Sequence, residues 1–262
     1  MPVHLTQQDT TAVITIGPGE RRNALTLEDW LALRDAALRV GDVRAVVVTG
    51  SGGHFSSGID LSPTNPMIGR IAPAIKEGRE QPARALLEEL KACVQAIADL
   101  DVPTFAAIEG ACVGGGLEVA LACDIRIAAA DAIIALPETR AGMIPDVGGC
   151  ARLTRLIGPG RAADLVCTGR RLSGTEAFQL GVVERVVPTG TALAVALEAA
   201  TQVAANGPTA VRMALNIVRV APDLGLSEAL AVETRAGVAA LTSGEPGEGI
   251  RAFFERRAPR WS

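Results

Sequence analysis

Short runs of valine, isoleucine and alanine alternate along the chain with segments whose apolar residues recur every three to four positions. The runs predict buried strands and the periodic segments predict helices, which together are typical of an α/β protein. Strands are predicted at residues 11–16, 44–49, 103–108, 125–129, 133–136 and 182–187. Helices are predicted at residues 26–40, 82–100, 114–123, 149–157 and 160–167.

From about residue 191 onward every segment has helical character, and the strands stop near Pro188. We therefore predict a mixed core over residues 1–200 and a helical region over residues 201–262, which could pack on the core or on a neighbouring subunit. Thr26 is expected to cap the first helix, because acidic residues follow in the turn where the helix dipole favours them.

Residues 62–81 break this alternation, because prolines recur and no period is kept. The stretch is interpreted either as a mobile lid or as a plain surface excursion, the second being the usual outcome for such a segment.

The chain has 262 residues and 48% hydrophobic content, enough for one large domain or for one domain with a small appendage. No apolar run approaches the ~18 residues of a membrane span, and the N-terminus lacks the basic and apolar regions of a secretory signal. These features predict a cytoplasmic protein. The net charge of −4 argues against a nucleic-acid partner, so a small-molecule substrate is expected.

The five cysteines are odd in number, include no C-x-x-C and lie mostly among apolar residues, which predicts buried thiols rather than disulfides or a zinc site. The histidines are His4, in a polar terminus, and His54. A histidine-based metal centre or a Ser-His-Asp triad is therefore nearly excluded, and no metal site is predicted.

The candidate chemistry centres on two glutamates. Glu118 lies just inside a helix that three glycines, 114–116, open, and Glu138 follows Leu136-Pro137 at the end of a strand. Backbone N–H groups framed by glycine beside two carboxyl groups suit an enzyme that moves protons next to a carbonyl. A dinucleotide-binding turn is the alternative, but Cys112 occupies the place of its second glycine. A purely structural role, in which a glycine lets the helix approach a strand closely, explains three glycines in a row less well than it explains one.

Several stretches, taken in order, resemble the crotonase family, the enoyl-CoA hydratases and isomerases, over essentially the whole chain. They are RNAL (22–25), FSSGIDL (55–61), IEGACVGGGLEVALACDIRIAA (108–129), LPETRAGMIPDVGG (136–149) with RL (152–153), GVV (181–183) and EGIRAFFER (248–256). Each fragment alone is a weak signal, whereas the ordered set is specific.

The resemblance implies a spiral of ββα units that carries an acyl-CoA site, followed by a C-terminal helical region used in trimer contacts, with a homotrimer or a dimer of trimers as the assembly. It places an oxyanion hole at the backbone N–H groups of Ile59 and Gly115, and the two hydratase carboxyls at Glu118 and Glu138. Coenzyme A would be part of the substrate, with no separate cofactor.

Asp146 complicates this interpretation. The dienoyl-CoA isomerase branch of the family has an aspartate at the matching place and the same G-I-D-L loop, yet it has aspartate where this chain has Glu118. Asp146 is equally ordinary as a turn residue between Pro145 and Gly148. We therefore predict hydration of an enoyl-CoA, with isomerisation through Asp146 and Glu138 as the alternative and a non-catalytic acyl-CoA binder as the third possibility.

Coenzyme A contacts are implied for a further set of positions. Hydratases often carry a lysine shortly after the G-x-D of the loop, where this chain has Leu61-Ser62-Pro63, so arginines are the candidates for the nucleotide phosphates. An exposed arginine needs no ligand, and Asp60 is expected to shape its loop. The residues implied in substrate binding are Arg21, Arg22, Ala24, Ser57, Gly58, Asp60, Leu61, Gly114 and Arg256.

Overall fold

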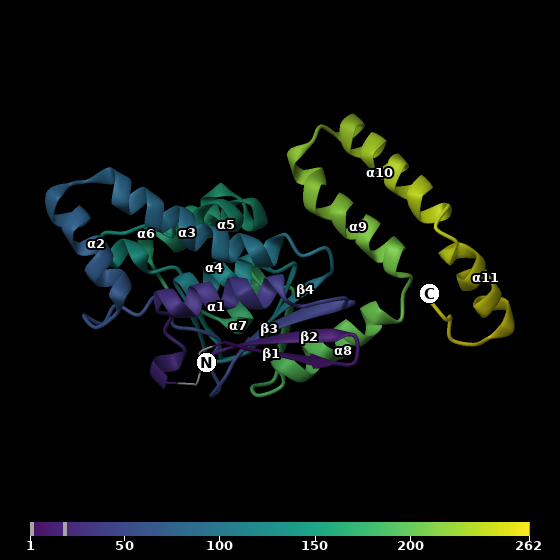
Figure 1. Ribbon diagram of the computed structural model, residues 1–262, viewed down its shortest axis with the longest axis horizontal. Helices are drawn as coiled ribbons and strands as arrows, with labels where there is room; N and C mark the ends of the chain where they lie inside the picture. Colours follow the sequence, from purple (N-terminus) through teal and green to yellow (C-terminus); the bar gives the residue numbers. More distant parts are fainter. Residues whose placement is uncertain (1–2, 18–19, 262) are drawn as a thin grey trace.

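The computed structural model describes residues 3–17 and 20–261. It has a mixed α/β body from which the last three helices extend as an arm (Figure 1). The main sheet has the strand order β1-β2-β3-β4-β6-β9, in which β1 is antiparallel to β2 and the remaining pairs are parallel. These strands are Val3–Gln8, Thr11–Ile16, Ala45–Gly50, Thr104–Ile108, Ile125–Ala129 and Arg185–Val187.

A second, smaller sheet has the order β5-β7-β8, formed by Ala111–Val113, Ile133–Ala135 and Leu172–Ser173. The chain passes from the main sheet to the small one and then into a helix, first through β4, β5 and α4 and again through β6 and β7. An isolated bridge between Ser56 and Cys112 adds the segment after β3 to the same series. The predicted succession of ββα units is confirmed.

The helices of the body are α1 (Leu27–Leu38), α2 (Pro66–Glu77), α3 (Glu80–Ala98), α4 (Gly115–Ala122), α5 (Gly149–Ile157), α6 (Pro159–Thr168), α7 (Gly174–Leu180) and α8 (Ala192–Ala204). The arm contains α9 (Pro208–Val220), α10 (Leu226–Leu241) and α11 (Glu245–Glu255). Short 3-10 helices are η1 (Glu20–Arg22), η2 (Glu138–Ala141) and η3 (Ala221–Asp223). Within the described ranges, the helices fall short of the length and apolar character that a membrane crossing requires.

Thr26 caps α1, as predicted. Its Oγ1 accepts from the Asp29 N–H at 3.3 Å, and the Asp29 carboxylate accepts from the Thr26 N–H at 2.7 Å. This reciprocal capping box fixes where α1 begins.

The prediction that residues 62–81 lack regular structure is wrong, because α2 lies there. Pro66 occupies the first helical turn, where its missing N–H is no loss, and Asn65 caps the helix by accepting from the Met67 N–H at 3.1 Å. Gly78, in the left-handed region at φ +64°, ends α2 and lets the chain turn back into α3. The prolines were interpreted as helix breakers, whereas Pro66 begins α2 and Pro73 lies inside it.

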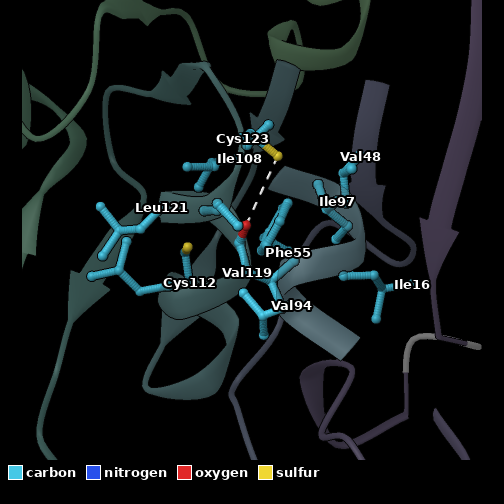
Figure 2. Close-up of a cluster of buried hydrophobic side chains, with 14 of the residues drawn as sticks. Ile16, Val48, Phe55, Val94, Ile97, Ile108, Cys112, Val119, Leu121 and Cys123 are labelled. Atoms are coloured by element: carbon cyan, nitrogen blue, oxygen red, sulfur yellow. Dashed lines mark hydrogen bonds between the residues drawn. The ribbon is translucent and has the colours of Figure 1, made fainter. Parts of the chain in front are cut away.

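Two apolar cores pack on the two faces of the main sheet. The larger joins the sheet to α1, α3 and α4, and Figure 2 shows part of it, with Ile97 and Val94 of α3 facing Val48 and Phe55. The smaller core lies under α8, whose alanines pack against Val47, Phe105 and Ile127. The predicted division near residue 200 thus falls inside a helix that covers the sheet.

The thiols are free, as predicted, and their burial differs. Cys93, Cys112 and Cys123 are buried, whereas Cys150 is half-buried and Cys167 is exposed. The prediction of a buried thiol is therefore wrong for Cys167.

Candidate active site

A cavity of about 350 Å³ lies between the α2–α3 hairpin, the start of α4 and the segment that follows β7. Glu118, Glu138 and Asp146 all line it, so the fold brings the three predicted carboxyl groups together. Most of the remaining wall is apolar: Ile59, Leu61, Met67, Ile68, Ile71, Ile75, Ala83, Leu86, Leu87, Leu90, Val113, Pro137, Ala141, Met143 and Ile144.

Ile59 borders the cavity on a short extended segment that pairs with Leu25. The Leu25 N–H donates to the Gly58 carbonyl at 2.7 Å, and the Asp60 N–H donates to the Leu25 carbonyl at 2.9 Å. Because successive N–H groups of an extended segment point in opposite directions, the Ile59 N–H points away from Leu25.

Gly58 allows this segment to lie against the start of α4. Its φ is +88°, and a Cβ at this position would lie 2.7 Å from the Val113 carbonyl oxygen and 3.0 Å from the Gly115 nitrogen. Gly115 is the first residue of α4, where an N–H has no acceptor within the helix and the helix dipole favours negative charge. The Ile59 and Gly115 segments therefore meet at one wall of the cavity, as an oxyanion hole requires.

Glu118 is only 2% exposed, and one of its carboxylate oxygens, Oε1, accepts two backbone hydrogen bonds. The donors are the N–H groups of Val147 at 3.0 Å and Gly149 at 2.8 Å. Burial raises the pKa of Glu118 to about 8, the charges of Glu138 and Asp146 add to the rise, and the two backbone donors oppose it. Glu118 is thus a fixed carboxyl that holds a proton up to slightly alkaline pH.

Glu138 begins η2, directly after Pro137, and is half-buried. Within the described chain its Oε2 is buried and has no hydrogen-bond partner. Burial raises the pKa of Glu138, and the charge of Asp146 raises it further. A buried oxygen at the wall of a cavity, with no partner in the protein, is suited to bind a water or substrate group that enters.

Asp146 also faces the cavity and is half-buried. Burial raises the pKa of Asp146, whereas its own backbone N–H and the nearby Lys91 lower it. The sequence left a turn residue and a residue facing the site as equal alternatives, and both describe Asp146, which lies in a turn and lines the cavity.

Asp60 shapes its loop, as expected. Its carboxylate accepts from the Ser62 N–H at 2.9 Å and from the Arg21 guanidinium at 2.9 Å, and its carbonyl accepts from the Asn65 side chain at 2.6 Å. The contacts of the carboxylate with Ser62, first, and with Arg21 lower the pKa of Asp60. Arg21 is thereby held beside the loop, outside the lining of the cavity.

The other predicted binding residues divide into two groups. Ser57, Gly58, Leu61 and Gly114 line the cavity. Arg22, Ala24 and Arg256 do not, and Arg256 lies at the end of α11, on the opposite side of the molecule from α2 (Figure 1). Within one chain, Arg256 is thus far from the site.

The sequence reasoning missed the apolar wall that α2 and α3 supply. A usable signal was present, because Met67, Ile71 and Ile75 recur every fourth position after the helix start at Asn65-Pro66. The sequence carries no such signal for the N–H donors of Val147 and Gly149, because every residue except proline has a backbone N–H.

Comparison with known proteins gives the same result along the whole chain. A family model described as enoyl-CoA hydratase/isomerase matches residues 6–262. The chain belongs to this family. The enoyl-CoA hydratase EchA19 of Mycobacterium tuberculosis is 35% identical over 256 residues, covering 96% of this chain and 92% of the relative. The carnitinyl-CoA dehydratase of Salmonella typhi is 35% identical over 268 residues, covering 99% of this chain and 97% of the relative.

Among solved structures, the crystal structure of enoyl-CoA hydratase from Bacillus anthracis aligns with a TM-score of 0.90 at 33% identity, covering 100% of this chain and 99% of that one. The protein is therefore an enzyme of the enoyl-CoA hydratase/isomerase family with the crotonase fold. Members with different reactions in their names are similarly close, so the reaction has to be argued from the site.

The buried carboxyl of this family member predicts an unusual dependence of stability on pH. Because the pKa of Glu118 rises from 4.5 to about 8 on folding, the folded state binds more protons than the unfolded state between these values. The free energy of unfolding should therefore fall as pH rises through this window. Glu118→Gln keeps an oxygen acceptor for both backbone donors and does not titrate, so its Tm relative to wild type should increase from pH 5 to pH 9. Thermal melts at both pH values measure this, and a difference in Tm that does not change with pH would contradict the buried, protonated carboxyl.

Proposed function

We propose that this member of the family is an enoyl-CoA hydratase, which adds water across the 2,3 double bond of a trans-2-enoyl-CoA thioester. One observation carries the proposal: the Glu118 and Glu138 carboxyls line the same cavity as Ile59 and Gly115, whose backbone N–H groups form the proposed oxyanion hole.

The reaction passes through an enolate, and each group has a part in it. The thioester carbonyl oxygen accepts from the two N–H groups, which bind it more strongly as it gains negative charge. A water then lies between the carboxyls. One carboxyl takes a proton from the water as its oxygen adds to Cβ, and the other delivers a proton to Cα.

The charge state of the site supports this chemistry. Both glutamates have raised pKa values, and the charges of the cavity carboxyls disfavour one another's ionised form. Glu118, whose pKa is raised to about 8, keeps its proton near neutral pH and can therefore donate it.

The apolar wall supports an aliphatic acyl group as the part of the substrate that enters the cavity. Leu86 and Leu90 of α3 and Met67 of α2 are buried, and Ile75 and Ile144 are exposed at its edge. A polar acyl group would lose its hydration there without gaining partners.

Turnover of crotonyl-CoA and of longer trans-2-enoyl-CoAs tests the proposal, with loss of the absorbance of the conjugated thioester as the readout. Hydration of at least one of these substrates is expected. Binding of acyl-CoA by calorimetry without any hydration would instead favour the non-catalytic binder.

A dienoyl-CoA isomerase is the second candidate, which the position of Asp146 favours. An isomerase that moves a conjugated diene removes a proton at one carbon and returns it farther along the chain, so a third carboxyl beside Glu138 and the acyl tail has a use.

Asp146→Asn separates the two reactions. A hydratase does not need this carboxyl, so hydration of crotonyl-CoA should stay within about tenfold of wild type, a change in barrier of roughly 1.4 kcal/mol or less. Both activities are measured on the same preparations. If a 3,5-dienoyl-CoA is isomerised much faster than any enoyl-CoA is hydrated, and the variant loses that activity, the isomerase is the correct assignment.

The arm supports a trimer or a dimer of trimers. Its helices carry large apolar side chains exposed to solvent, namely Leu226, Leu230, Leu241, Ile250, Phe253 and Phe254. Burying such a surface between subunits removes it from water. Light scattering at micromolar concentration is expected to give the mass of a trimer or hexamer, and a monomer would contradict this assembly.

A further inference from the structure

Glu118 is held in place by the turn at residues 145–149, which connects the segment after η2 to α5. Both of its backbone donors, the N–H groups of Val147 and Gly149, belong to this turn and bind the same oxygen. Residues 145–148 lie outside any regular helix or strand and Gly149 is the first residue of α5, so the position of the carboxyl depends on what fixes the turn against α5.

Arg152, in the first turn of α5, lies across the turn at residues 145–149. The Nη1 atom donates to the carbonyl of Val147 at 3.3 Å, and Nη2 donates to the side-chain oxygen of Gln95 on α3 at 2.8 Å. Gly148 leaves the room for this contact: its φ is +123°, and a Cβ there would overlap with Nη1. The guanidinium thus joins the turn to α3.

Arg152 also brings a positive charge to Glu118, and the two attract each other. The other titratable or charged groups that act on the two residues come from several elements. They are Glu138 of η2, Asp146 of the turn, Cys150 of α5, Cys123 after α4, Lys91 of α3 and Asp99 at the end of α3. Glu138 and Asp146 disfavour the ionised form of Glu118, whereas the cation of Arg152 attracts it.

We propose that Arg152 is a positioning residue for Glu118, and that it acts through the turn at residues 145–149 and through its charge. Gln95 keeps the guanidinium in this orientation. The inference rests on the proposed function, because it assumes that Glu118 takes part in proton transfer. Arg152 is not among the residues that line the cavity, so it acts without touching the substrate.

Kinetics of Arg152→Met and Arg152→Lys as a function of pH test the inference. Arg152→Met should lower kcat about 10- to 100-fold with KM within about threefold, because a carboxyl that moves by about 1 Å loses its alignment. It should also shift the alkaline limb of kcat/KM upward by about 0.5 pH unit or more, because a lost cation favours the protonated carboxyl. Arg152→Lys keeps the charge, so the limb should return to the wild-type position even though kcat is only partly restored.

Arg155→Met is the matched control. Arg155 lies on the same helix and pairs with Asp223 of η3, outside the cavity, so neither kcat nor the alkaline limb should change. A fall in kcat for Arg152→Met with the alkaline limb unmoved would reduce Arg152 to a structural residue and overturn the inference. A kcat within threefold of wild type would overturn it as well.

A second measurement separates this inference from the proposed function, because it needs no turnover. Arg152→Met is melted at pH 6 and pH 9.5, in the wild-type background and in Glu118→Gln. The loss of Tm should be larger at pH 9.5 in the wild-type background and independent of pH in Glu118→Gln, where no charge forms. A loss independent of pH in both backgrounds overturns the inference, whereas a wild-type protein that hydrates no enoyl-CoA overturns only the function.

Discussion

Gly115→Pro is expected to reduce turnover by about 10²- to 10³-fold, the effect of removing one donor from an oxyanion hole. Proline lacks the N–H that would bind the enolate oxygen, and the first position of a helix is where its ring is otherwise accepted. The defect should therefore lie in kcat rather than in the folding of α4, contrary to a simple expectation that proline distorts the helix.

The added carbon atoms need their own control, because a Cβ at position 115 would lie 2.9 Å from the buried ring of Trp30. Gly115→Ala places the same Cβ there and keeps the N–H. The ratio of the kcat values of the alanine and proline variants thus isolates the donor, with circular dichroism melts to show that both are folded. A proline variant within tenfold of the alanine variant would remove Gly115 from the oxyanion hole.

Glu138→Gln and Glu118→Gln are each expected to lower kcat by about 10² or more, with the affinity for acyl-CoA nearly unchanged. The amide is nearly the same size as the carboxyl and still accepts hydrogen bonds, so the loss reports proton transfer. For Glu118, the backbone donors at Val147 and Gly149 still find an oxygen.

Glu88→Gln, an exposed carboxyl on α3, serves as the control for the loss of a negative charge and should leave kcat unchanged. Initial rates on crotonyl-CoA and calorimetric titration with a saturated acyl-CoA give the two quantities. Near-normal hydration by either variant would show that its glutamate has been assigned the wrong role.

The elements that the sequence predicted well are those whose local pattern and burial agree. The strand at Thr11–Ile16 matches its prediction in full, because both of its faces are covered and four of its six residues are apolar. Strand β1 was missed because it is an edge strand, with Val3 its only buried residue. The two-residue strand β8 is too short for any periodic signal.

For the candidate site, too, the sequence predicted the features that depend on local residue types and missed those that depend on packing. The glycines before α4 and the two glutamates marked it, since each needs a particular residue type in the sequence. What determines the proton affinity of Glu118 could not be predicted, because burial and the turn at residues 145–149 arise only when α3, α4 and α5 pack. The same holds for the apolar wall, which depends on how α2 folds back on α3.

The apolar wall and the carboxyls come from different stretches of the chain. Most of the wall lies on the α2–α3 hairpin, whereas Glu118 and Glu138 lie on α4 and η2. Substitutions at Ile68, Ile71 or Leu87 therefore leave the proton-transfer groups and their backbone donors untouched. The acyl group that the cavity accepts can therefore be changed by substitutions in one hairpin while the groups that move protons stay the same.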